Sequence, residues 1–243
     1  MQLYDRIGLG YRRSRREDAR IAARILDALD GLSSVINVGA GAGSYEPRDR
    51  RVVAVEPSDV MIRQRTAEAA PVVRASASHL PFADGAFAAA LAVLTIHHWP
   101  DLELGLAELR RTARERVVVL THDAGAGALG FWLEDYLPEL RELSRRSLPS
   151  LDEIRRCLGA SSVVDVPVPH DCCDGFLGAF WRRPHSYLDP AVRAGISVFA
   201  ELPGVELGLA ALQSDLASGE WRRRYGWLLG RDELDLGYRL VIA

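Results

Sequence analysis

The hydrophobic positions of the chain form two kinds of pattern. Nearly continuous apolar runs occur at Val35–Val38, Val52–Val55 and Phe87–Leu94. Short runs of this kind are typical of strands that are buried on both faces. Over 17–29 and 101–112 apolar residues instead recur every three or four positions, which predicts helices. Strands that alternate with helices predict an α/β fold with a mainly parallel sheet.

Weaker patterns complete this picture. A helix is expected from Ser58 to about Ala69, and further strands at Pro71–Ala75, Arg116–Thr121 and Ser161–Val168. From Gly125 onward the chain is helical in pattern and rich in aromatic residues, until Leu236–Ile242 alternates like an antiparallel strand. We therefore expect one domain with three parts: a core over 1–123, a helical cap with one strand over 124–230, and a closing strand over 231–243.

The first predicted strand runs directly into a glycine-rich turn. Gly39, Gly41 and Gly43 occupy alternate positions, so three Cβ atoms are missing where the chain must turn and where a ligand can approach the backbone. Glu56 ends the next strand, which is where an acidic residue holds a ribose in open parallel sheets. The combination predicts a nucleoside site.

The glycine spacing indicates which nucleoside is bound. Dinucleotide folds use G-x-G-x-x-G and place the pyrophosphate on a helix N-terminus. Here Ser44 occupies the third glycine position of that pattern, and 45–49 leave little room for a helix before the next strand. A nucleoside without phosphates is favoured, and S-adenosylmethionine is the common one.

Three segments then carry a family resemblance. The segment 39–43 with Glu56 resembles the cofactor signature of class I S-adenosylmethionine-dependent methyltransferases, in particular the small-molecule "type 11"-like family. Ala75–Phe82 resembles the adenine segment of these enzymes, and Phe87–Trp99 resembles their fourth strand with its exit loop. The likeness covers roughly 4–121. It implies a Rossmann-like sheet of seven strands, mostly parallel with an antiparallel last strand, and helices on both faces.

The resemblance also implies the cofactor contacts. Tyr11 and Arg15 lie four residues apart in a leading segment that would cover the cofactor and meet its methionine carboxylate; the alternative is a solvated basic helix start. Met61 would flank the adenine, although a methionine at helical spacing is equally typical of plain core. The full set of expected cofactor residues is Tyr11, Arg15, Asn37, Gly39, Ala40, Gly41, Gly43, Glu56, Pro57, Met61, Ser76, Ala77, Leu94 and Thr95.

Several acids that are usual in the family are replaced. Ser76 stands where an aspartate accepts from the adenine amino group, and a hydroxyl accepts more weakly than a carboxylate. Ser78 and Ala88 also occupy acidic positions of the family. Asn37 replaces the acid before the first glycine, but its amide oxygen can still accept from the ammonium of the cofactor.

Histidines are the candidates for acid–base chemistry. Methyl transfer from a sulfonium is an in-line displacement, and a hydroxyl or amine acceptor must lose a proton. His97, on the exit loop of the fourth strand, is the first candidate base, and His122, at the end of the next strand, is the second. The alternative is that His98 is a structural donor and His97 only shapes the pocket. The expected acceptor-binding residues are His98, Trp99, Asp123, Trp132, His170 and Trp181.

Composition excludes several other functions. All 30 basic residues are arginine, so the chain has no lysine for a Schiff base or a Walker motif. The net charge of −3 gives no basic footprint for nucleic acid, and no apolar stretch reaches the ~20 residues of a membrane span. The pairs His122-Asp123 and His170-Asp171 are far apart in sequence and have no ligand spacing, so we expect no metal. The three cysteines form no C-x-x-C pair, so we expect a reducing, cytoplasmic location.

The sequence thus predicts an S-adenosylmethionine-dependent methyltransferase that releases S-adenosylhomocysteine and acts on a small molecule as a monomer or homodimer. Neither nucleic acid nor membrane is expected as a partner. Two alternatives stay open at this stage: a non-catalytic S-adenosylmethionine-binding sensor or scaffold, and a nicotinamide-dependent oxidoreductase.

Overall fold

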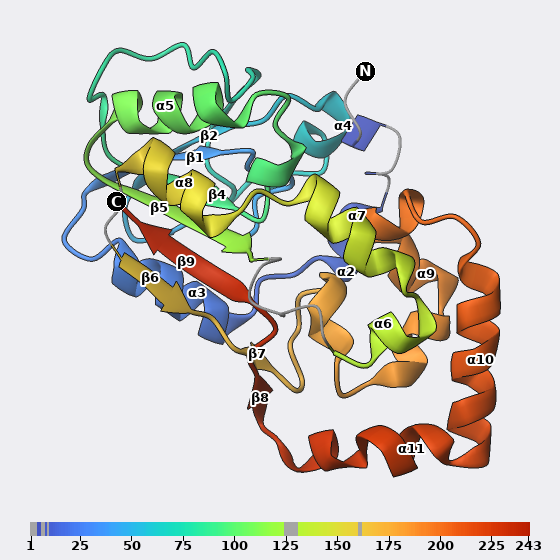
Figure 1. Cartoon of the computed structure of the whole chain (residues 1–243). Helices are drawn as coiled ribbons and strands as arrows, with labels where there is room; N and C mark the ends of the chain where they lie inside the picture. Colours follow the sequence, from blue (N-terminus) through green and yellow to red (C-terminus); the bar gives the residue numbers. More distant parts are fainter. Residues whose placement is uncertain (1–3, 6–7, 9, 124–130, 160–161) are drawn as a thin grey trace.

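A seven-stranded sheet forms the centre of the protein, which is described here from a computed structural model that covers residues 4–5, 8, 10–123, 131–159 and 162–243 (Figure 1). The strand order is β3-β2-β1-β4-β5-β9-β6, and only β9 is antiparallel to its neighbours. The predicted α/β architecture is thereby confirmed. The strands of this sheet are β1 (Ser34–Val38), β2 (Arg51–Val55), β3 (Val72–Val73), β4 (Phe87–Val93), β5 (Ala113–His122), β6 (Ser162–Asp165) and β9 (Tyr238–Ile242).

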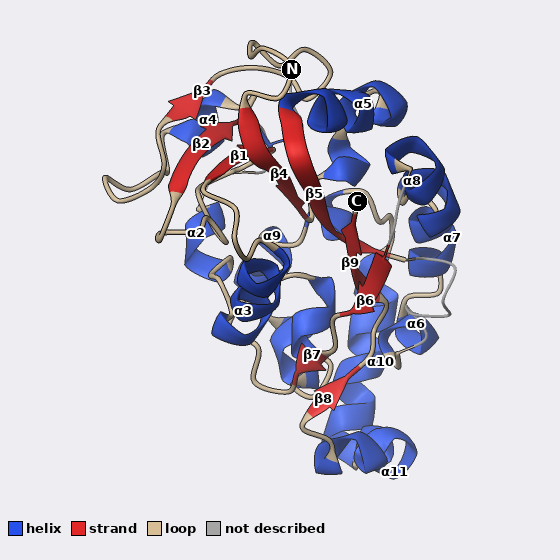
Figure 2. Cartoon of the chain, turned by 90° about the vertical axis from the view of Figure 1, so that its left-hand side faces the viewer, coloured by secondary structure: helices blue, strands red, loops and turns tan. Residues whose placement is uncertain are grey.

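Each face of the sheet is covered by its own apolar layer because side chains alternate along a strand. Ile36 and Val38 of β1 join a cluster with α5 (Leu102–Thr112) and α8 (Leu151–Leu158). Val35 points to the opposite face, where the residues of α3 (Ala19–Ala28) pack. Figure 2 shows α3 on one side of the sheet and α5 and α8 on the other.

The cap, defined as residues 131–147 and 166–234, continues the layer that α3 begins. It is an assembly of short elements below the carboxyl ends of the central strands (Figure 1). Its elements are α6 (Leu133–Tyr136), α7 (Glu139–Ser147), β7 (Val168–Pro169), α9 (Pro190–Ala194), α10 (Val205–Ser218), α11 (Glu220–Tyr225), β8 (Glu233–Leu234) and 3-10 turns at Leu177–Phe180, Pro184–Leu188, Ser197–Ala200 and Gly226–Gly230. The interval 148–165, which was predicted as part of the cap, instead supplies α8 and β6 to the sheet layers.

Among the predicted elements that differ in extent, one helix and one strand differ most. The helix predicted from Ser58 to Ala69 is only α4 (Asp59–Ile62), because Arg65 turns back to the Glu46 carboxylate at 2.7 Å and to the Ala70 carbonyl at 2.8 Å. The strand predicted over 161–168 is divided into β6 and β7, with Pro167 between them. Proline has no N–H to give to a ladder, so the pairing stops there.

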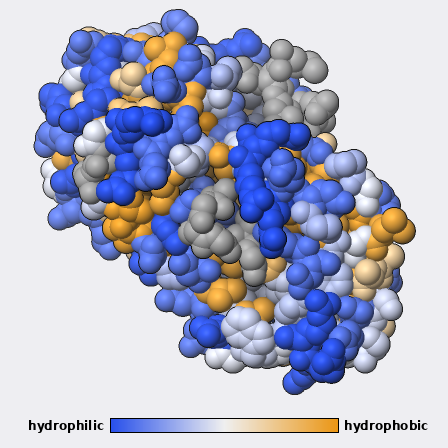
Figure 3. Space-filling view, in the orientation of Figure 1, coloured by the Kyte–Doolittle hydropathy of each residue, from blue (hydrophilic) through white to orange (hydrophobic). Residues whose placement is uncertain are grey.

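The face drawn in Figure 3 is mainly hydrophilic, and its hydrophobic side chains form small separate patches. Within the described ranges, no helix combines the length and apolar composition needed to cross a bilayer.

Candidate functional site

The glycine loop folds as a tight turn against the end of β2. The backbone N–H groups of Gly39 and Ala40 both donate to the Val55 carbonyl, at 2.8 and 3.0 Å. Gly39, Gly41 and Gly43 all have positive φ, which glycine adopts without strain. Between β1 and β2 the chain makes turns and no helix, so the phosphate-binding helix of a dinucleotide site is absent from this fully described interval.

Glu56 bridges this loop to the start of α4. Its carboxylate accepts from the backbone N–H of Gly41 at 2.8 Å and from that of Ser58 at 2.9 Å. The side chain is buried, and desolvation raises the pKa of the Glu56 carboxyl. The carboxylate therefore lies at the loop, where it can accept from hydroxyl groups of a ligand.

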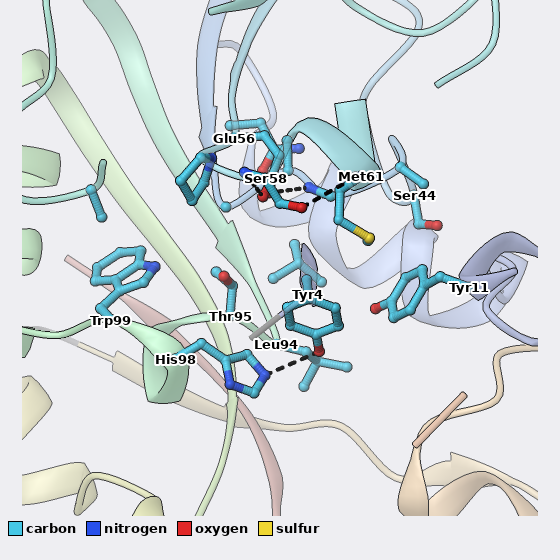
Figure 4. A pocket seen from close by; sticks show the side chains of 18 of the residues that line it. Tyr4, Tyr11, Ser44, Glu56, Ser58, Met61, Leu94, Thr95, His98 and Trp99 are labelled. Atoms are coloured by element: carbon cyan, nitrogen blue, oxygen red, sulfur yellow. Dashed lines mark hydrogen bonds between the residues drawn. The ribbon is translucent and has the colours of Figure 1, made fainter. Parts of the chain in front are cut away.

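A cavity of about 90 Å³ opens beside the loop and Glu56 (Figure 4). It brings together every expected cofactor residue except Gly43, and it also includes Trp99. In Figure 4 the ring of Tyr4 lies between Met61 and His98, and a dashed line joins its hydroxyl to the His98 ring. The residues that line this cavity are Tyr4, Tyr11, Arg15, Asn37, Gly39, Ala40, Gly41, Ala42, Ser44, Tyr45, Glu56, Pro57, Ser58, Met61, Ser76, Ala77, Val93, Leu94, Thr95, His98, Trp99 and Pro100.

One buried polar atom of this cavity lacks a partner. The amide of Asn37 donates through Nδ2 to Glu46 at 3.4 Å, while its Oδ1 has no hydrogen bond among the described residues. A buried acceptor without a partner is costly and indicates a donor that arrives with a ligand. An ammonium group, like the one of S-adenosylmethionine, would satisfy it.

Arg15, which lines this cavity, forms an ion pair with Asp174 of the cap. Arg15 donates through Nε to one Asp174 oxygen at 2.6 Å and through Nη2 to the other at 3.3 Å. The hydroxyl of Tyr45, next to the glycine loop, donates to the same carboxylate at 3.0 Å. Nη1 of Arg15 makes no hydrogen bond in the described part of the chain, which leaves it available for a ligand carboxylate.

The sequence reasoning did not identify Asp174, Tyr45 or Tyr4 as members of the site. Asp174 is separated from Arg15 by 159 positions, so no local pattern connects them. The nearby pair His170-Asp171 raised only the question of a metal site, and the sequence analysis expects no metal. In the described ranges no three His, Cys, Asp or Glu side chains gather in an arrangement that could hold a metal ion.

A second cavity of about 400 Å³ adjoins the first, and four residues line both: Tyr4, Arg15, Leu94 and His98. Leu94 has a φ of +50°, an uncommon conformation that turns the chain out of β4 at this junction. The remaining lining residues come from the 3-10 turn after β4, from β5 and β9, and from the cap with the adjoining Leu148: His97, His122, Leu143, Ser144, Arg146, Ser147, Leu148, Phe176, Leu177, Ile196, Ser197, Val198, Glu201 and Tyr238.

Three histidines face this second cavity. The rings of His97 and His98 lie 3.9 Å apart between centroids, and Nε2 of His122 lies 2.8 Å from the Leu236 carbonyl. Burial lowers the pKa of His98 and of His122 to about 4, and it lowers the pKa of His97 well below its ordinary value. All three imidazoles are therefore neutral at pH 7.

The other residues expected to bind an acceptor lie elsewhere. Trp132 and Trp181 are buried inside the cap, where Nε1 of Trp132 donates to the Trp181 carbonyl at 2.7 Å. His170 bonds to the Asp232 carbonyl at 3.1 Å through Nδ1. Neither these residues nor Asp123 line the two cavities.

Comparison with known proteins identifies a methyltransferase domain. Residues 36–120 match the family model described as a methyltransferase domain. The chain is similar to the crystal structure of a protein of Anabaena variabilis ATCC 29413 assigned as a methyltransferase from an antibiotic biosynthesis pathway, with 37% identity and a TM-score of 0.88 over 95% of this chain and 98% of that one. No match is found among curated proteins.

More distant structures share the fold. Geranyl diphosphate C-methyltransferase of Streptomyces coelicolor A3(2), solved with Mg²⁺, geranyl diphosphate and S-adenosylhomocysteine, has 16% identity and a TM-score of 0.54 over 93% of this chain and 78% of its own. The YcgJ protein of Bacillus subtilis has 16% identity and a TM-score of 0.56 over 93% of this chain and 97% of its own.

Proposed function

The chain belongs to the class I S-adenosylmethionine-dependent methyltransferases, and on that premise we propose that it transfers a methyl group to a small molecule bound in the second cavity. The observation that carries the proposal is the junction of the two cavities at Tyr4, Leu94 and His98. A cofactor in the first cavity could reach an acceptor in the second only through this junction. Small acceptors are favoured because the second cavity has the volume of a typical small-molecule site.

The residues of the first cavity suit the cofactor. S-adenosylmethionine supplies an electrophilic methyl group on a positively charged sulfur. In our proposal Glu56 accepts from the ribose hydroxyls, Oδ1 of Asn37 accepts from the ammonium, and Nη1 of Arg15 donates to the carboxylate. Pro57 and Met61 would pack on the adenine, and the backbone at Ser76 and Ala77 would bind its edge. These contacts would hold the methyl group toward the junction, so their main contribution is orientation.

Binding of S-adenosylhomocysteine tests the cofactor site directly. Loss of the two hydrogen bonds that we assign to Glu56 is expected to cost about 3 kcal/mol, so Glu56→Ala should raise the Kd about 100-fold by calorimetry. Glu115→Ala is the matched control, because that carboxylate is exposed at the distant start of β5. An unchanged Kd for Glu56→Ala would remove Glu56 from the ribose role.

Turnover is tested separately with methyl-labelled S-adenosylmethionine and a panel of hydroxyl, amine and carbon acceptors. Incorporation of label into an extracted small molecule would support the proposal. Tight binding of S-adenosylhomocysteine with no transfer to any acceptor would favour a cofactor-binding sensor instead. Thermal protection by NAD and not by S-adenosylhomocysteine would favour an oxidoreductase.

A further inference from the structure

His122 is the one imidazole of the second cavity whose tautomer is fixed by the fold. Its Nε2 lies 2.8 Å from the Leu236 carbonyl oxygen. A carbonyl can only accept, so Nε2 must carry the proton and Nδ1 must keep its lone pair. The ring is also held edge-on against Tyr238, with centroids 4.9 Å apart and planes at 75°.

The lone pair on Nδ1 is buried and lacks a partner. His122 is 7% exposed, and Nδ1 makes no hydrogen bond within the described residues. An acceptor atom that is withdrawn from water costs free energy until a donor reaches it. Since His122 lines the cavity, a ligand in that cavity can supply the missing donor.

The charge of the cavity restricts what that ligand can be. Among its described lining residues only Arg15, Arg146 and Glu201 are charged. Arg15 is paired with Asp174 at 2.6 Å and its remaining Nη1 is assigned above to the cofactor carboxylate, while Arg146 and Glu201 are both exposed. The described lining thus offers no buried carboxylate to an ammonium and no further cation to a carboxylate. A charged acceptor would lose its hydration without compensation.

We propose that the acceptor is an uncharged hydroxyl compound of the phenol or enol class, and that its O–H donates to Nδ1 of His122. The proposal rests on the function proposed above and extends it to the atom that is methylated. The cavity wall also has apolar side chains, among them Leu94, Leu143, Phe176 and Ile196, that can pack against an arene.

The same contact provides the proton transfer that such an acceptor needs. As the acceptor oxygen forms its bond to the methyl carbon, the carbon–sulfur bond breaks and its electron pair stays on sulfur. The hydroxyl proton moves to Nδ1, so His122 becomes an imidazolium that later releases the proton to solvent. A weakly acidic O–H requires such a base, whereas a neutral amine attacks through its own lone pair.

Equilibrium binding of hydroxyarenes tests this assignment without turnover. In the presence of S-adenosylhomocysteine, 2-naphthol is expected to bind at least 10-fold more tightly than 2-methoxynaphthalene, and phenol more tightly than anisole. His122→Phe keeps a ring against Tyr238 but removes Nδ1, so both ratios should fall to about one. His185→Phe is the matched control, because His185 is exposed and lines neither cavity.

A second readout is the ¹⁵N spectrum of the histidine ring. We expect the His122 proton on Nε2, and a shift of the Nδ1 resonance when 2-naphthol is added. A proton on Nδ1, equal affinity for alcohol and ether, failure of both hydroxyl probes to bind, or tighter binding of 2-naphthoate or naphthylmethylammonium would overturn the proposal. Intact binding of S-adenosylhomocysteine in those cases would show that the cofactor proposal stands by itself.

Discussion

Replacement of Gly39 by alanine tests how closely the glycine loop fits the exit of β4. A Cβ at Gly39, where φ is +72°, would lie 2.1 Å from Oγ1 and 2.8 Å from Cγ2 of Thr95. The loop has little freedom to withdraw, because the Gly39 N–H donates to Val55 at 2.8 Å. The left-handed conformation costs alanine about 1 kcal/mol, and overpacking adds about 1–3 kcal/mol. We expect the free energy of unfolding to fall by about 2–4 kcal/mol.

Gly31 provides the matched control. It has nearly the same φ, +77°, but a Cβ there meets nothing within 4 Å. Gly31→Ala should therefore lose only about 1 kcal/mol in urea denaturation without cofactor. Thr95→Ala removes the two nearest atoms, so in the Gly39→Ala background it should recover about 1–2 kcal/mol. Equal losses at positions 31 and 39 would refute the packing argument.

Three further predictions concern the ion pair, the histidines and the cap. Asp174→Asn leaves the Arg15 charge uncompensated, so the free energy of unfolding measured in urea should fall by about 3 kcal/mol. The variant should also bind S-adenosylhomocysteine more weakly. An unchanged free energy of unfolding together with an unchanged affinity would contradict the role of the ion pair. His98 and His122 have pKa values of about 4 in the folded protein, below the value of ~6.5 in the unfolded chain. The unfolded chain therefore binds protons first as the pH falls, so the free energy of unfolding is highest above pH ~6.5 and decreases toward pH 4. Between pH 6.5 and 5 each should lower the free energy of unfolding by ~2 kcal/mol, and a flat profile would show that the two rings are not held neutral. Trp132→Phe removes the hydrogen bond to the Trp181 carbonyl, so the free energy of unfolding should fall by about 1–3 kcal/mol. The affinities for S-adenosylhomocysteine and 2-naphthol should stay within twofold of the wild-type values. A large loss of affinity for 2-naphthol would instead place Trp132 at the acceptor.

The core of the fold could be predicted because its signals are local. Continuous apolar runs identify β1, β2 and β4, and each is followed directly by the residues that line the first cavity. The end of α4 could not be predicted in this way. It depends on Arg65 reaching Glu46, a residue 19 positions earlier.

The second cavity was much less predictable than the first. Aromatic residues at helical spacing are equally compatible with a pocket wall and with a core, and Trp132 and Trp181 are in the core of the cap. The apolar residues that do line the cavity, such as Leu143 and Ile196, have no distinguishing pattern in the sequence. His97 and His122 were identifiable because one follows β4 and the other ends β5, at the edge where parallel sheets place their ligands.

The contact between Arg15 and Asp174 also has a consequence for synthesis of the protein. Residue 15 leaves the ribosome long before residue 174, and the entropy of closing so long a loop delays such contacts relative to the local ones. The glycine loop and central strands can assemble while the later half of the chain is still being made. The segment around Tyr11 can dock only afterwards, so a nascent chain should acquire its affinity for the nucleoside at the very end of folding.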